Sequence, residues 1–254
     1  MYRIISIFLI GLTCSAWAQD EEWKMQVKED QYILPSGYAF HISNPLGPVR
    51  VQPSKDEKCH VTARITFVES FEGVAQLEPK MDANGIQLHV RFLKEGKEME
   101  ALTPLTVKVD LILQIPEKHD LHVTTDAGPI EIDRAGSAIH AKSKTGNIVI
   151  KANGPVTSYS STGKTKVYFY NRDKLEGSDI KSYAGALAIY LPEGCDALFT
   201  GKTRGKVVSD YRSEVVPDKD SKFNAITINL GKATQKINAL SEQGGLQIFS
   251  FFPG

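Results

Sequence analysis

Five tyrosines are the residues of this chain best suited to contact a ligand. Tyr159 and Tyr183 take the same outward position in two successive copies of a short repeated phrase. Tyr168, Tyr170 and Tyr190 flank the strands that follow those copies. Flat aromatic rings in a row can stack on sugars or on a partner chain. The alternative is a purely structural role, in which the tyrosines stack in a ladder between strands and stabilise the fold by a few tenths to about 1 kcal/mol per pair.

Metal and cofactor chemistry is weakly supported by the sequence. Of six scattered histidines, only His122 and His140 share an outward position in adjacent copies of the phrase. A metal ion there would need a third ligand, so we expect solvent-exposed strand residues and no metal. The sequence contains no phosphate-binding loop, zinc-protease motif, nucleophile elbow, CxxC pair or calcium loop. It therefore predicts no cofactor.

Catalysis is also weakly supported. A β-helical polysaccharide lyase or hydrolase needs convergent carboxylates or a basic cluster on one face. The candidate carboxylates fall at different positions of the phrase, mostly at turns: Asp126, Glu131, Asp133 and Asp179. We therefore predict that the chain is not an enzyme, and a carbohydrate-active β-helix enzyme is the less favoured alternative.

The repeated phrase is the element that must position these residues. An alternating strand leads into a turn with glycine, and two apolar residues follow at alternate positions. The clearest copies, Leu121–Ile132 and Ile139–Ile150, are offset by 18 residues. Five further copies fit the template: 40–51, 156–167, 180–189 with a turn shorter by two, a looser 197–207, and 237–248. Repetition at this period is typical of a β-solenoid.

Inward residues of the phrase differ in size between its two strands. The first strand carries small residues such as Ala141, Ser143 and Ser160, and the second carries Ile148 and Ile150. Small side chains opposite large ones allow two faces to interdigitate at native density. One copy cannot bury its own apolar face, so neighbouring copies must stack.

These patterns predict an all-β fold: a short β-solenoid (β-helix) of about six coils with an N-terminal antiparallel β cap. The cap holds three longer alternating runs, 59–68, 86–93 and 105–115, which we expect to form one antiparallel sheet. The predicted division is a signal peptide at 1–18, a cap at 19–116 that includes the first repeat-like turn, and a solenoid at 117–254 with a polar insertion near 210–221. Helix content should be very low.

The N-terminus reads as a secretory signal. Arg3 precedes an apolar run over 4–12, and Ala16 and Ala18 form a small-x-small cleavage site. The run is shorter than the roughly 20 residues of a membrane span, and no later segment is long and apolar enough to span. We therefore predict export to the periplasm, cell surface or medium. Lipidation of Cys14 is the less favoured alternative, because the bulky Thr13 precedes it.

The balance of charges bears on which classes of partner the chain can bind. The whole chain has 30 basic and 30 acidic residues, and only Arg3 is charged within 1–18. A near-neutral chain without basic clusters argues against nucleic acid and anionic lipid as partners.

Cys59 and Cys195 could form a disulfide, although buried free thiols are the favoured interpretation. Cys59 adjoins His60, but neighbours along a strand point to opposite faces and make a poor nucleophile–base pair.

Several phrases resemble one known family. They are Asn44–Val51, Val107–Pro116, and the turns Thr125–Ile130 and Lys144–Ile148. They are similar to the DUF4097/DUF2807 group of putative adhesins, over most of the chain from about Tyr38. The resemblance implies an exported β-helical protein with no catalytic residues to carry over; some relatives are associated with envelope stress responses. The turns at Gly163 and Gly185 lack the family's Asn or Asp after glycine, which predicts a different corner shape there.

The C-terminal residues 249–254 are unusually aromatic. We interpret them as a hydrophobic plug over the last coil, with a docking patch for another protein as the alternative.

Together the observations predict an exported, non-catalytic cell-envelope or surface protein of putative adhesin type that binds a glycan or an envelope protein. The main alternative is a partner or sensor protein of an envelope stress response.

Overall fold

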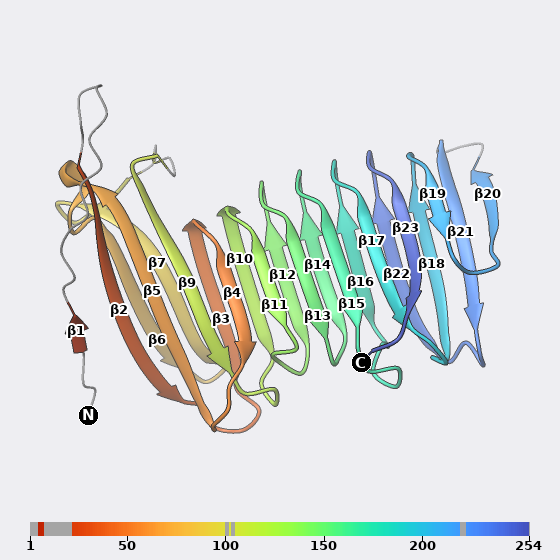
Figure 1. Cartoon of the computed structure of the whole chain (residues 1–254), viewed down its shortest axis with the longest axis horizontal. Coiled ribbons are helices and arrows are strands. Elements are labelled where there is room, and N and C mark those ends of the chain that lie inside the picture. Colours follow the sequence, from red (N-terminus) through yellow and green to blue (C-terminus); the bar gives the residue numbers. More distant parts are fainter. Residues whose placement is uncertain (1–4, 8–21, 100–101, 103–104, 219–221, 254) are drawn as a thin grey trace.

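The computed structural model describes residues 5–7, 22–99, 102, 105–218 and 222–253, and it shows an elongated all-β molecule (Figure 1). Within these residues the only helical element is the 3-10 turn η1 (Glu69–Phe71). The all-β prediction and the low helix content are confirmed. No helix in the described part of the chain has the length and apolar character needed to cross a bilayer. Apart from residues 5–7, the predicted signal peptide lies outside the described residues, and so does Cys14.

Two large mixed sheets make up the molecule. The 11-stranded sheet contains, in spatial order, β1 (Ile5–Ile7), β2 (Trp23–Ile33), β5 (Lys58–Val68), β9 (Val107–Ile115), β4 (Val49–Pro53), β11 (Ile130–Asp133), β13 (Ile148–Ala152), β15 (Thr165–Phe169), β17 (Leu187–Pro192), β23 (Leu246–Phe251) and β19 (Val207–Ser209). The 12-stranded sheet contains β20 (Glu214–Asp218), β21 (Phe223–Leu230), β18 (Ala197–Thr203), β22 (Gln235–Ser241), β16 (Ser178–Ser182), β14 (Val156–Ser160), β12 (Ile139–Ser143), β10 (Leu121–Ala127), β3 (Ala39–Leu46), β7 (Gly85–Lys94) and β6 (Ala75–Asp82), with β8 (Lys97–Glu98) paired to β7.

Each copy of the repeated phrase supplies one strand to each sheet. The first strand joins the 12-stranded sheet, the chain turns, and the second strand joins the 11-stranded sheet. Equivalent strands of neighbouring copies are parallel and in register, so that Leu121, Ile139 and Val156 lie side by side. Inward residues of both sheets are fully buried in one continuous core. The alternation seen in the sequence thus becomes a shared interior between two faces.

At both ends of the molecule, the order of the strand pairs in space differs from their order in the sequence. The pair β3/β4 lies between β7/β9 and β10/β11, and the pair β22/β23 lies between β16/β17 and β18/β19 (Figure 1). The last strand, β23, is therefore an interior strand with a parallel neighbour on each side. The interpretation of residues 249–254 as a plug over the last coil is wrong, because 249–251 continue an internal strand whose residues 246–248 pair with β19 beyond it.

The cap is split between the two sheets. The three runs predicted at 59–68, 86–93 and 105–115 form β5, β7 and β9. β5 and β9 pair antiparallel in the 11-stranded sheet, but β7 belongs to the 12-stranded sheet, where it pairs with β6. One common antiparallel sheet is therefore wrong. The parallel pairing of β9 with β4 and of β7 with β3 explains the difference, because it continues the stacking of the repeats into the cap.

A buried ladder of polar side chains holds the turns of the repeats. It contains one residue from each repeat, in register from strand to strand: Asn44, Thr125, Ser143, Ser160, Ser182, Ser241 and Thr203. The Ser160 hydroxyl donates to the carbonyl of Gly163, and the Ser143 hydroxyl accepts the N–H of Gly146. These bonds satisfy polar groups that burial would otherwise leave costly. The small inward residues of the first strand thus fix the turn that follows them.

Next to this ladder runs a column of glycines: Gly47, Gly128, Gly146, Gly163, Gly185, Gly244 and Gly205. A Cβ at Gly163 would lie 1.9 Å from the carbonyl oxygen of Gly146, and one at Gly185 would lie 1.9 Å from that of Gly163. These positions require glycine for close backbone approach, whereas the turn requires no left-handed backbone at either. The corners at Gly163 and Gly185 keep the same stacking as the corner at Gly146, and a different corner shape there stays a prediction.

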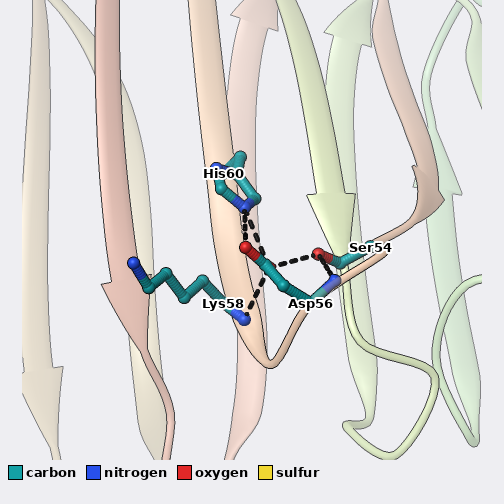
Figure 2. A network of polar contacts seen from close by, with 4 residues as sticks. All are labelled: Ser54, Asp56, Lys58 and His60. Atoms are coloured by element: carbon teal, nitrogen blue, oxygen red, sulfur yellow. Dashed lines mark hydrogen bonds and ion pairs between the residues drawn. The ribbon is translucent and has the colours of Figure 1, made fainter.

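A tight polar turn carries the chain out of the first repeat and into β5 (Figure 2). Asp56 accepts hydrogen bonds from the Ser54 hydroxyl and the Lys58 N–H, both at 2.9 Å, and its carboxylate lies 2.9 Å from His60 Nε2. The contact with His60, followed by the other two bonds, lowers the pKa of Asp56 to about 2. This His–Asp pair therefore orders a turn on the surface, and Cys59 between them points into the core.

Replacing Gly163 by alanine tests the stacking of the glycine column. The new methyl group would overlap a backbone carbonyl that cannot move away, so we expect a loss of about 3 kcal/mol or more in the free energy of unfolding. Gly37→Ala is the matched control, since nothing lies within 4 Å of its Cβ and only its φ of +85° opposes the change. That control should cost about 1–2 kcal/mol. Equal losses in urea unfolding of the two variants would contradict the close approach.

Candidate binding surface

Tyr159 points outward from β14 of the 12-stranded sheet, and Tyr183 lies in the turn that follows β16. Their exposed fractions are 39% and 44%, and neither ring contacts another aromatic ring within the described residues. They are not strand neighbours: Tyr159 is in register with Lys181, and Tyr183 lies two residues further along the chain, past the end of β16. The prediction that the two tyrosines share one position of the repeat is therefore wrong.

A buried serine explains the shifted register. Ser178 takes the first inward position of its repeat, which the sequence pattern assigns to Ile180. Its hydroxyl accepts the N–H of Val156 and donates to the carbonyl of Leu175, so this polar side chain is satisfied inside the core. With Ser178 in place, the turn of this repeat has the usual length. Two hydrogen bonds thus explain why hydrophobic periodicity misplaces the strand by two residues.

Tyr159 belongs to a straight row of outward side chains across β12, β14, β16, β22 and β18. In register, these are Lys142, Tyr159, Lys181, Leu240 and Lys202, here called the lysine–tyrosine row. Lys181 forms an ion pair with Asp179, with a distance of 2.5 Å between Nζ and Oδ2. Lys142 and Lys202 form no ion pair within the described residues. Sequence reasoning missed these lysines because no two are adjacent along the chain.

Tyr168 and Tyr190 form a stacked pair on the outer face of the opposite sheet. Their ring centroids lie 4.1 Å apart with an interplanar angle of 10°, and Phe249 extends the stack beside Tyr190 at 5.1 Å. Partial burial and the neighbouring Tyr190 raise the pKa of Tyr168. In this tyrosine ladder the facing ring surfaces cover one another. This geometry matches the alternative in which the tyrosines form a stabilising ladder between strands.

Tyr170 lies at the side of that ladder. Phe251 meets its ring nearly edge-on, with centroids 5.4 Å apart, and the Arg134 guanidinium lies 5.5 Å from the ring centroid. Tyr170 also lines an open pocket of about 480 Å³ whose other lining residues are mostly polar: Asn153, Asn171, Arg172, Asp173, Pro192, Glu193 and Pro253. The structure thus brings together three of the five predicted tyrosines, and the two phenylalanines of the C-terminal strand join them.

A histidine ladder lies next to the lysine–tyrosine row on the 12-stranded sheet. His122 stacks on His140 at 4.3 Å, as their shared position in the repeat predicts, and His41 stacks on the other side at 4.4 Å. The rings are near parallel and do not converge on a point. Within the described residues, no three His, Cys, Asp or Glu side chains are arranged to hold a metal ion. Burial, and then its two histidine neighbours, lower the pKa of His122 to about 4.

Each carboxylate singled out from the sequence lies in an ion pair. Asp126 pairs with Lys144 and Glu131 pairs with Arg50, at 2.8 and 3.1 Å. Asp133 contacts both Arg134 and Lys151, and Asp179 contacts Lys181. These acids are divided between the two outer faces of the molecule, since Glu131 and Asp133 lie on the 11-stranded sheet. Glu131 and Asp133 lie two residues apart on β11 and line one pocket, where Arg50 and Lys151 pair with them.

The two cysteines are buried free thiols, as favoured from the sequence. Burial raises the pKa of Cys59 to about 12 and also raises that of Cys195. A thiol held protonated in the core is a poor nucleophile. The predicted separation of Cys59 from His60 is confirmed, because Cys59 is fully buried while His60 contacts Asp56 on the surface.

Comparisons with known proteins found similar solved structures. No family model matches the chain, and no curated protein does. A putative cell adhesion protein from Clostridium sporogenes is 14% identical, with 89% of this chain and 100% of that chain covered and a TM-score of 0.41. A putative adhesin from Bacteroides fragilis is 12% identical, with coverages of 89% and 97% and a TM-score of 0.42. A putative adhesin from Parabacteroides merdae is 10% identical, with coverages of 87% and 95% and a TM-score of 0.33.

Replacing Tyr190 by alanine tests the structural role of the tyrosine ladder. The change removes the ring between Tyr168 and Phe249, so we expect the free energy of unfolding to fall by about 2 kcal/mol. Urea unfolding measures this loss. The control is Phe252→Ala, because Phe252 is 77% exposed and its removal should leave stability unchanged. An unchanged unfolding midpoint in the Tyr190 variant would show that the stack contributes nothing.

The lowered pKa of His122 predicts a loss of stability in mild acid. An unfolded histidine takes up a proton near pH 6.5, whereas folded His122 does so only near pH 4. Between these values the unfolded chain binds more protons, so stability falls as the pH decreases from 6.5 to 4, with no further change from this group below that range. Unfolding should therefore require less urea at pH 5 than at pH 7. The variant His122→Thr, which copies Thr157 of a neighbouring repeat, should show a shallower dependence; an equal slope would refute the assignment.

Proposed function

We propose that this chain is an exported β-solenoid of about six coils that acts as a non-catalytic binding module of adhesin type. Its ligand is a glycan, held on the outer face of the 12-stranded sheet around Tyr159 and Tyr183. The observation that carries this proposal is the exposed ring of Tyr159 on the sheet, with that of Tyr183 in the turn after β16, near Lys142 and Lys202, which form no ion pair within the described residues. Each coil supplies one strand to each sheet, and both strands pair in parallel with those of the next coil, which supports the solenoid description.

Ring accessibility decides between the two aromatic surfaces. A sugar stacks on the face of a ring, where its C–H groups meet the negative π surface. In the tyrosine ladder Tyr168 and Tyr190 each cover one face of the other, and Phe249 lies on the far side of Tyr190. Tyr159 and Tyr183 are covered by no ring within the described residues, and about two-fifths of each side chain is exposed. The 12-stranded face therefore supports sugar binding better than the 11-stranded face.

Export rests on the N-terminal sequence, which has the charge, apolar run and small residues of a secretory signal. The adhesin type rests on the family resemblance in the repeated turns. The similar solved structures carry the same description, but their TM-scores are too low to add to the argument. The absence of catalysis is supported by the pairing of each candidate carboxylate with a cation, since a general acid must keep its proton near neutral pH.

A glycan array tests this function. The purified protein should bind a defined set of glycans, and the double variant Tyr159→Ala, Tyr183→Ala should bind them about tenfold more weakly, because two stacking contacts of about 0.7 kcal/mol each are lost. Phe252→Ala is the control, since it removes an exposed aromatic ring outside the proposed surface.

Normal binding by the double variant would contradict the proposed surface. Absence of binding to any glycan, together with co-purification of a membrane protein, would favour the alternative of a partner in an envelope stress response.

A further inference from the structure

We propose that the lysine–tyrosine row binds an anionic polysaccharide that lies across the strands and carries one negative charge per disaccharide. This inference rests on the proposed glycan-binding function and names its ligand class. The row crosses five adjacent strands in the order Lys142, Tyr159, Lys181, Leu240 and Lys202. A cation thus alternates with an apolar side chain at every step.

The spacing of the row fits a chain of sugars. Neighbouring strands lie about 4.8 Å apart, so lysines on alternate strands recur about every 9.6 Å. That interval is close to the length of a disaccharide. A polymer with one carboxylate per disaccharide can place a charge at each lysine and an uncharged sugar over Tyr159 or Leu240. The exposed ring of Tyr159 supplies the stacking surface between the first two cations.

The charge of the row is available to a ligand. Among the described residues, Lys142 and Lys202 have no acidic partner, so a carboxylate bound there displaces no internal ion pair. The central lysine, Lys181, already contacts Asp179 and must share its ammonium group between Asp179 and the ligand. We therefore expect the two outer lysines to contribute most of the electrostatic attraction.

The flanking groups leave the row basic. On one side lie His140, Thr157 and Asp179, each two residues before a member of the row, and Asp179 is neutralised by Lys181. On the other side, Asp126 is neutralised by Lys144 at 2.8 Å. Glu242 lies near the row, two residues after Leu240. Asp179 and Glu242 offset part of the positive charge of the row, whereas Lys142 and Lys202 keep theirs, which favours a polyanion over a neutral glycan at the same surface.

Two polymers that differ only in their carboxylates distinguish the contribution of charge to binding from that of the sugar rings. The probe is a hyaluronan oligosaccharide, which has one carboxylate per disaccharide, and its control is the same oligosaccharide with the carboxylates chemically reduced to alcohols. Calorimetry should show that hyaluronan binds at least fivefold more tightly than the reduced form at low salt. The difference should shrink when the salt is raised to about 0.5 M, because exposed charges are then screened over less than about 5 Å.

Matched variants locate the charge. We expect Lys142→Gln with Lys202→Gln to weaken hyaluronan binding three- to tenfold, as two exposed charge contacts would. The control is Lys166→Gln, which removes an exposed lysine without an ion-pair partner from the outer face of the opposite sheet. Unchanged thermal unfolding would show that both proteins remain folded.

The outcomes distinguish this inference from the proposed function. If the reduced polymer binds as tightly as hyaluronan and Tyr159→Ala still weakens it, glycan binding stands and the anionic specificity is overturned. If the lysine variant binds like the wild type, the assignment of the row is overturned. If hyaluronan, chondroitin sulfate and polygalacturonate all fail to bind while a neutral glycan binds, the ligand class is wrong; if no glycan binds, both proposals fail.

Discussion

The close approach of one backbone turn to the next is the constraint on which the rest of this structure depends. At each glycine of the column, a carbonyl of the neighbouring strand or turn occupies the space where a side chain would begin. The buried polar ladder holds the same turns from inside by hydrogen bonds such as that from Ser160 to Gly163. Together these contacts fix the register of every strand that follows, since a slip by one residue would turn the inward side chains outward.

Fixed register also determines what the outer faces present. Outward residues of successive repeats must line up, so any side chain that recurs becomes a ladder or a row. Three histidines, two tyrosines with a phenylalanine, and three spaced lysines are all aligned in this way. Which of these alignments is available to a ligand depends on contact between neighbours: rings that stack cover each other, whereas Lys142 and Tyr159 leave each other open.

Much of the architecture was predictable from the sequence, since alternation and turn glycines report directly on burial and backbone approach. The pairing of His122 with His140 followed from the repeat, and free thiols were favoured because Cys59 and Cys195 lie far apart in the sequence. The register of Tyr183 did not follow, because Ser178 satisfies its hydroxyl inside the core and so occupies a position where the pattern calls for an apolar residue. The split cap and the displaced terminal pairs also escaped prediction, because the pairing of β7 with β3 or β23 with β17 joins segments distant in sequence, where local periodicity carries no information.

The position of β22 and β23 has a consequence for how the molecule is assembled. In the sequence these strands come after both of their neighbours, yet each lies between two strands that precede it. The repeats therefore cannot stack one at a time in the order of synthesis: until β22 and β23 have emerged, β16 and β17 lack the neighbours that they have in the folded protein. Loss of β22 and β23 would remove an internal repeat, and β18 and β19 would lose their parallel partners.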